Sequence, residues 1–163
     1  MIDGRAWLTD NIEQARGVSE AAWKTVADFA LLWSLFEAEL CAAHASPYTL
    51  VSIADSLDDR ALEEGVNAAF DYWRARYIEG ASTNQRFNEL FVETGGRTVA
   101  ESILLADAPD ERSKLKCALL IVYRLRNNLF HGTKEIRTFN DQKENLDHGT
   151  AVLATVMGWA GVR

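Results

Sequence analysis

Apolar positions recur every three or four residues along most of this chain, the spacing of one face of an α-helix. No alternating run of Val, Ile and Thr reaches the length of a strand, and only Pro47 and Pro109 interrupt the helical pattern. The pattern predicts an all-α fold, a helical bundle with two or three long helices and short accessory helices.

The first predicted elements are a short segment and a long helix. A short turn or helix follows Thr9, its candidate N-cap, and ends near Gly17. Ser19 is predicted to cap a long helix over residues 20–45, which Pro47 ends because the residue before a proline disfavours helical geometry. Its expected apolar stripe comprises Trp23, Val26, Ala30, Trp33, Leu40 and Ala43.

The most regular pattern lies in residues 110–131, with Gly132 at the expected C-terminal cap. Its expected apolar stripe comprises Leu115, Ala118, Leu119, Val122, Leu125 and Leu129. In residues 60–77, capped by Asp58 or Asp59 and closed by Gly80, the apolar face comprises Leu62, Val66, Ala69, Phe70, Trp73 and Tyr77. The other helices are expected over residues 50–57, from residues 82–84 to the Gly95–Gly96 stop, and over residues 98–106 and 141–159.

The composition indicates one folded domain spanning residues 1–163. The chain has 48% apolar and 25% charged residues, with no internal repeat and no low-complexity linker. Cys41 and Cys117 show neither disulfide-framework nor zinc spacing, which fits a reducing, cytoplasmic location. The polar N-terminus does not resemble a secretory signal, and the most apolar stretch, residues 27–45, carries three acidic residues. We therefore expect no membrane span.

The net charge of −7 is unevenly distributed along the chain. Residues 112–137 contain seven of the 17 basic residues and one of the 24 acidic ones, a local charge of +6. The other residues contain 10 basic and 23 acidic side chains, a balance of −13. This distribution predicts one basic element on an acidic body, and a basic surface is what phosphate binding requires.

The segment from Tyr123 to Gly132 contains a fixed cation, two amides and an imidazole at a helix end. At roughly 100° per residue, Asn127 and His131 lie one turn apart and about 40° around the axis, so the amide can orient the imidazole. Arg126 lies roughly 140° from His131 around the axis. A partner subunit or a substrate would have to bridge the separation between these two side chains.

These side chains suit phosphodiester chemistry. The negative end of the helix dipole favours a protonated His131, and a histidine titrating near neutral pH can give or take a proton. The guanidinium of Arg126 matches phosphate oxygens in geometry and charge. Metal ligation is not indicated, because no second ligand occurs nearby at suitable spacing. The other interpretation is a solvated helix end with a capping histidine.

The stretch Arg126-Asn127-x3-His131, on a long helix late in an all-α domain, resembles the Arg-x4-6-His motif of HEPN domains. Residues 32–38 also resemble the first long helix of many HEPN domains, and the resemblance covers about residues 20–160. It implies a homodimer that cleaves RNA without metal or cofactor, by attack of a ribose 2′-hydroxyl on the adjacent phosphate. Arg126 and His131 would be catalytic, and Asn127 would be the polar residue that usually follows the arginine.

The resemblance also implies partners, and it leaves a second function open. HEPN ribonucleases occur in toxin–antitoxin and defence systems, so an antitoxin or a nucleotidyltransferase is an expected partner. Some HEPN toxins carry a modifiable tyrosine two residues after the histidine, where this chain has Thr133. Other HEPN domains are non-catalytic, and the alternative is therefore a helical dimer that binds a protein or nucleotide ligand as a regulatory module.

Further residues are candidates for supporting roles. Glu37 lies on an apolar helix face and either orients Arg126 or His131 from across the bundle or forms an ordinary buried ion pair. The candidate RNA-binding residues around the motif are Tyr123, Arg124, Asn128, Phe130 and Lys134.

Overall fold

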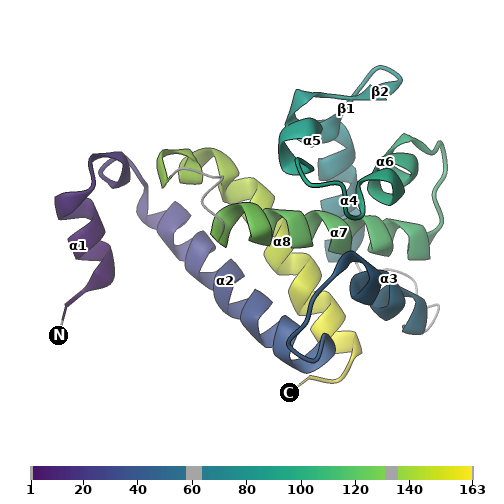
Figure 1. Cartoon of the computed structure of the whole chain (residues 1–163), viewed down its shortest axis with the longest axis horizontal. Coiled ribbons are helices and arrows are strands. Elements are labelled where there is room, and N and C mark those ends of the chain that lie inside the picture. The colour runs from purple at the N-terminus through teal and green to yellow at the C-terminus, as the bar shows by residue number, and fades with distance from the viewer. Residues whose placement is uncertain (1, 58–63, 131–135, 163) are drawn as a thin grey trace.

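The computed structural model describes residues 2–57, 64–130 and 136–162. Eight α-helices make up most of the described residues, which confirms the predicted all-α helical bundle (Figure 1). Three of them, α2, α7 and α8, have 20 or 21 residues. The helices are α1 (Gly4–Asn11), α2 (Glu20–Leu40), α3 (Pro47–Ser56), α4 (Glu64–Tyr77), α5 (Gln85–Leu90), α6 (Arg97–Leu105), α7 (Glu111–Phe130) and α8 (Phe139–Trp159). The minor elements are the 3-10 helices η1 (Glu13–Ala15) and η2 (Ile136–Thr138) and the hairpin strands β1 (Ile78–Glu79) and β2 (Ser82–Thr83).

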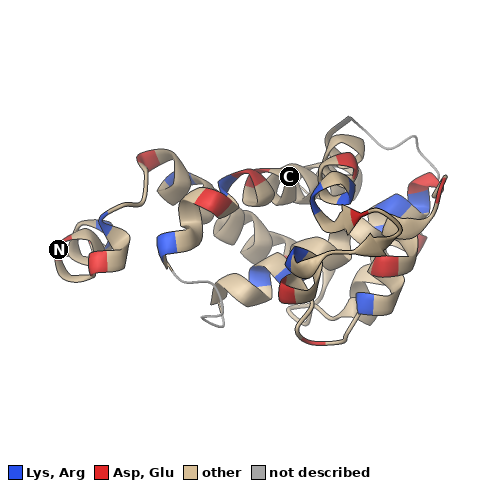
Figure 2. Cartoon of the chain, turned by 90° about the horizontal axis from the view of Figure 1, so that it is seen from above, with Lys and Arg blue, Asp and Glu red and all other residues tan. Residues whose placement is uncertain are grey.

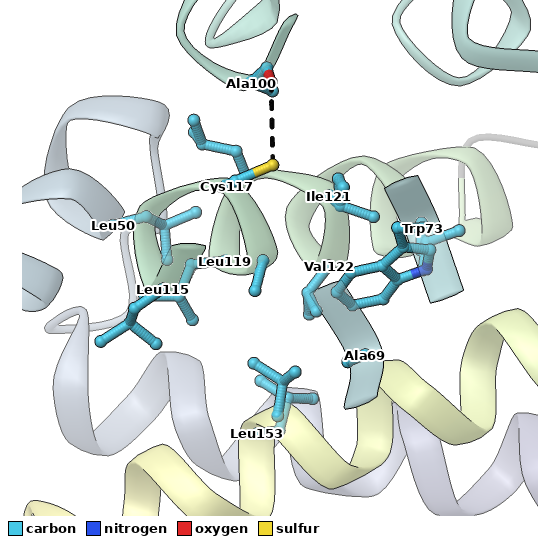
Figure 3. Packing of buried hydrophobic residues seen from close by; sticks show 14 of the residues in the cluster. Leu50, Ala69, Trp73, Ala100, Leu115, Cys117, Leu119, Ile121, Val122 and Leu153 are labelled. Atoms are coloured by element: carbon cyan, nitrogen blue, oxygen red, sulfur yellow. Dashed lines mark hydrogen bonds between the residues drawn. The ribbon is translucent and has the colours of Figure 1, made fainter. Parts of the chain in front are cut away.

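Helix α7 runs through the middle of the bundle, and α3, α4, α5, α6 and α8 all contact it. The predicted stripe of α7 is buried from Leu115 to Leu125, and Leu129 is half-buried. The buried surface of α7 is wider than the predicted stripe, however, because Cys117, Leu120 and Ile121 are buried as well. Figure 3 shows Cys117 pointing toward α6, while residues on the opposite side of α7 point toward α8. Neighbours on opposite sides therefore leave α7 no long solvent-exposed face.

Helix α2 packs most extensively against α8. Ser19 caps α2 as predicted, because its hydroxyl accepts a hydrogen bond of 3.1 Å from the backbone N–H of Ala22. The buried face is rotated from the predicted stripe, which shares only Trp33 with it, and most of the other predicted positions are half-buried. The buried residues of α2 are Ala22, Thr25, Phe29, Trp33 and Phe36.

Helix α2 ends at Leu40, earlier than predicted. Ala42 and Ala43 adopt left-handed backbone angles, with φ of 48° and 60°, which breaks the helix before the proline. The N–H of Ala43 reaches back to the carbonyl of Glu37 at 3.0 Å and so closes this turn. Pro47 is the first residue of α3, a position where its missing N–H costs nothing.

Several other predicted boundaries need correction. Thr9 lies inside α1 and is not its cap, because the carboxylate of Asp3 accepts hydrogen bonds from the first free N–H groups. Gly80 lies in the turn of the β1–β2 hairpin, whose two-residue strands are too short to give an alternating pattern in the sequence. The apolar face of α4 is buried as predicted from Val66 to Tyr77. Leu62 and the two candidate caps of this helix lie outside the described residues.

The packing of α2 on α8 leads to a stability prediction. A Cβ atom added at Gly149 would lie 2.8 Å from Cε2 of the buried Phe29, closer than packing allows. We expect Gly149→Ala to lower the free energy of unfolding by about 1–3 kcal/mol, measured by urea denaturation. Gly158→Ala, on the same helix with open space around the new atom, should instead be neutral or stabilising by up to about 1 kcal/mol. Equal effects of the two substitutions would contradict this account of the interface.

Candidate functional site

The candidate catalytic arginine lies in the last turns of α7, where contacts on several sides fix its guanidinium. Nη2 donates to Oε2 of Glu37 at 3.4 Å, and Nη1 donates to Oδ1 of Asn127 at 3.0 Å. The guanidinium carbon of Arg126 lies 5.6 Å from the ring centre of Trp33 and 5.5 Å from that of Phe130. With a side chain 26% exposed, Arg126 is held in place and still reaches solvent.

Glu37 links α2 to the end of α7. Besides Arg126, its carboxylate accepts hydrogen bonds from Nε1 of Trp33 at 3.1 Å and from the N–H of Ala45 at 3.3 Å. The side chain is 22% exposed, and the three donors stabilise its negative charge where little water reaches it. The expected contact between Glu37 and Arg126 across the bundle is therefore present, in the form of a half-buried ion pair.

The candidate catalytic histidine, His131, lies outside the described residues, as does Lys134. Phe130, the last residue of α7, is 54% exposed. The predicted contact of Asn127 with His131 also falls outside the described part of the chain. The Oδ1 atom of Asn127 accepts a hydrogen bond from Arg126, so this amide supports the arginine.

Two of the candidate RNA-binding residues are buried. Arg124 is 4% exposed, and its guanidinium donates to the carboxylate of Glu93 and to the carbonyl of Gly95. Asn128 is 9% exposed, and its Nδ2 donates to the carbonyl of Leu90 at 3.2 Å. These side chains connect α7 to the end of α5 and to the segment that follows it. Contact with RNA would instead require a position on the surface. Tyr123 is half-buried against the core.

Carboxylates neutralise part of the basic segment, residues 112–137. Among its described residues, four cations form ion pairs at N–O distances of 2.7 to 3.4 Å. Figure 2 shows acidic and basic residues interspersed along the bundle. The predicted free basic element is therefore wrong for these four cations, whose carboxylates come mostly from distant parts of the chain. The pairs are Lys114–Glu111, Lys116–Asp55, Arg124–Glu93 and Arg126–Glu37.

The sequence analysis missed a second polar site, a cleft of about 390 Å³ where the ends of α4, α5 and α8 meet. Its floor includes Asn145, which is 2% exposed. A polar residue at a buried position of α8, directly before Leu146, was the available sequence signal. The cleft is lined by Arg76, Tyr77, Arg86, Glu89, Leu90, Asp141, Gln142 and Asn145.

Neither metal-binding nor thiol chemistry finds support in the described residues. No group of three or more His, Cys, Asp or Glu side chains is placed there to bind a metal ion. Burial, followed by the negative charge of Glu37, raises the pKa of the Cys41 thiol to about 11. Complete burial also raises the pKa of the Cys117 thiol. Both thiols therefore stay protonated near neutral pH, where they are poor nucleophiles.

Comparisons with family models, curated proteins and solved structures gave no match to this chain. The resemblance to HEPN domains therefore rests on the residues of the motif and their setting. Among the described residues, no helix has both the length and the apolar character needed to cross a bilayer.

The geometry predicts that Glu37 matters more for stability than its neighbours on α2. Glu37→Ala removes an acceptor from three donors, and we expect it to lower the free energy of unfolding by about 1–3 kcal/mol in urea denaturation. Glu39→Ala is the matched control, because Glu39 is exposed on the same helix. That control should stay within about 0.5 kcal/mol of wild type. A loss in the control equal to that of Glu37→Ala would show that Glu37 contributes nothing specific.

Proposed function

We propose that this protein is a HEPN-like, metal-independent endoribonuclease that acts as a cytoplasmic homodimer, with Arg126 and His131 as its catalytic residues. The observation that carries the proposal is the fixed position of Arg126 at the end of α7. Glu37, Asn127 and two aromatic rings hold its guanidinium, yet the side chain keeps 26% of its surface exposed. Such a preorganised cation suits charge that develops on a phosphate.

In the proposed reaction the ribose 2′-oxygen attacks the adjacent phosphorus and the bond to the 5′-oxygen breaks. One His131 takes the 2′-hydroxyl proton as general base, and a general acid returns a proton to the leaving 5′-oxygen. The products are a 2′,3′-cyclic phosphate and a 5′-hydroxyl end. Arg126 donates hydrogen bonds to the non-bridging oxygens of the pentacoordinate phosphorus. In a homodimer, the second protomer would supply another arginine and histidine, and so both acid and base.

Glu37 would act as a positioning residue in this scheme. Its carboxylate holds Arg126 from across the bundle, and at 3.4 Å it neutralises part of the guanidinium charge. An arriving phosphate would share the guanidinium with Glu37. We therefore propose that Glu37 fixes the orientation of the Arg126 guanidinium, and that the ion pair weakens the interaction of this guanidinium with phosphate.

A non-catalytic helical dimer that binds a protein or nucleotide ligand is the second candidate function. Ion pairing of four cations in the basic segment favours it, because pairing reduces the field that would attract RNA. Exposed apolar side chains on α2 also favour it, with Leu31 71% and Leu35 44% exposed. Such a module would bind an antitoxin or another regulatory partner without cutting RNA.

Cleavage of single-stranded and structured RNA in excess EDTA tests the proposal. Wild-type protein should release fragments with 2′,3′-cyclic phosphate ends. His131→Ala and Arg126→Lys should each lower the rate about 100-fold or more, because one removes the proton carrier and the other the forked donor. His44→Ala and Arg74→Lys are matched controls on residues outside the site and should retain wild-type rates.

Equal thermal unfolding of the variants and wild type would show that lost cleavage is not lost folding. Cleavage that persists in both His131→Ala and Arg126→Lys would overturn the assignment of these residues. A wild-type dimer that cuts no RNA, and whose partner binding survives both substitutions, would establish the non-catalytic alternative. Growth gives a cellular readout, since induced wild-type protein should arrest a host that tolerates His131→Ala.

A further inference from the structure

The cleft between α4, α5 and α8 is a second candidate site, separate from the Arg126–Glu37 pair. The described hydrogen-bond partners of Arg126, Glu37 and Asn127, do not line the cleft, which has a volume of about 390 Å³. That volume falls at the lower end of the range of about 300–1,000 Å³ typical of small-molecule sites. Ligand binding in this cleft can therefore be tested independently of ribonuclease activity.

A hydrogen-bonded network forms the floor of the cleft. Asn145 accepts a hydrogen bond from Nε1 of Trp73 at 2.7 Å, and its Nδ2 donates to Oε1 of Gln142 at 3.0 Å. The hydroxyl of Tyr77 lies 3.1 Å from the same Nδ2 atom. Burial raises the pKa of Tyr77 to about 12, so this hydroxyl keeps its proton near neutral pH. The floor is thus neutral, polar and rigidly held by α4 and α8.

Two arginines of the cleft differ from those of α7. Arg76 and Arg86 form no ion pair with any carboxylate in the described part of the chain, whereas Arg124 and Arg126 both do. Arg76 is held with its guanidinium carbon 5.8 Å from the ring centre of Tyr72. Two guanidinium groups that line one cleft without internal counterions provide a setting for an external anion, and their forked donors match phosphate.

Two carboxylates also line the cleft. Glu89 and Asp141 are exposed carboxylates, and with the two arginines they bring the formal charge of the lining to zero. A long polyanion gains little from a lining of zero charge, whereas a small ligand with one anionic group and several hydroxyls can use both charges. Tyr77, the aromatic residue of the lining, is 2% exposed and offers no face on which a nucleobase could stack.

We infer that this cleft binds a small phosphorylated polyol, such as a sugar phosphate. Arg76 and Arg86 bind the phosphate, and Glu89, Asp141 and the amide of Gln142 receive the hydroxyl groups. The hydrogen-bonded network around Asn145 holds α4 and α8 together and so fixes the positions of these groups. The protein would thereby carry a small-metabolite site in addition to its proposed catalytic site.

Titration of the full-length protein, followed by NMR of the Trp73 indole N–H, tests this inference. Trp73 reports on the floor, because its indole donates to Asn145. Ribose 5-phosphate should shift this resonance saturably and bind at least about tenfold more tightly than ribose, a difference of about 1.4 kcal/mol. Arg86→Gln should weaken binding about tenfold. Arg74→Gln, the matched control on α4 outside the lining, should bind within about twofold of wild type.

The comparison ligands separate the possible sources of phosphate. Inorganic phosphate should bind more weakly than ribose 5-phosphate, because it has no hydroxyls for the carboxylates. Tighter binding of AMP than of ribose 5-phosphate would overturn the assignment to a polyol phosphate. Ribose binding as tight as that of its phosphate, unchanged affinity in Arg86→Gln, or no shift with any ligand at millimolar concentration would overturn the site itself.

Discussion

The burial of α7 on all sides is the constraint on which the rest of this structure depends. A helix enclosed by five others cannot leave a charged or amide side chain without a partner, because desolvation of such a group is costly. Arg124 and Asn128 are therefore bonded to Glu93, Gly95 and Leu90, in and just after α5. The polar groups of the central helix thus fix the irregular segment between α5 and α6 that packs over it.

The same constraint explains the position of the candidate catalytic arginine. The last turns of α7 stay buried at Arg124, Asn127 and Asn128, and only its final residue, Phe130, is exposed, at 54%. Arg126 lies between these buried positions, but its side chain is half-buried and paired with Glu37. A site at such a boundary combines two properties: a preorganised guanidinium on the protein side and access for a substrate on the other.

Local sequence patterns predicted the helices well, but they did not predict which helices pack together or which side chains form ion pairs. The bounds of α7 were predicted within one residue and those of α8 within two, because caps and periodicity act within one turn. An apolar stripe shows that one face is covered but not how many neighbours a helix has, so the enclosure of α7 escaped prediction. The partners of Arg124 and Arg126 lie 31 and 89 positions away, beyond the reach of any local pattern. The cleft around Asn145 combines three helices and was missed for the same reason.

Pairing, more than charge count, determines which arginines of this protein can act on a ligand. The acidic excess of the chain provides a carboxylate for each arginine in the last half of α7, and the predicted basic field is reduced accordingly. Arg76 and Arg86 have no such counterion among the described residues, although Glu89 and Asp141 line the same cleft. Chemistry at α7 must therefore come from the geometry of one half-buried arginine, whereas the cleft offers an anion two guanidinium groups that form no ion pair among the described residues.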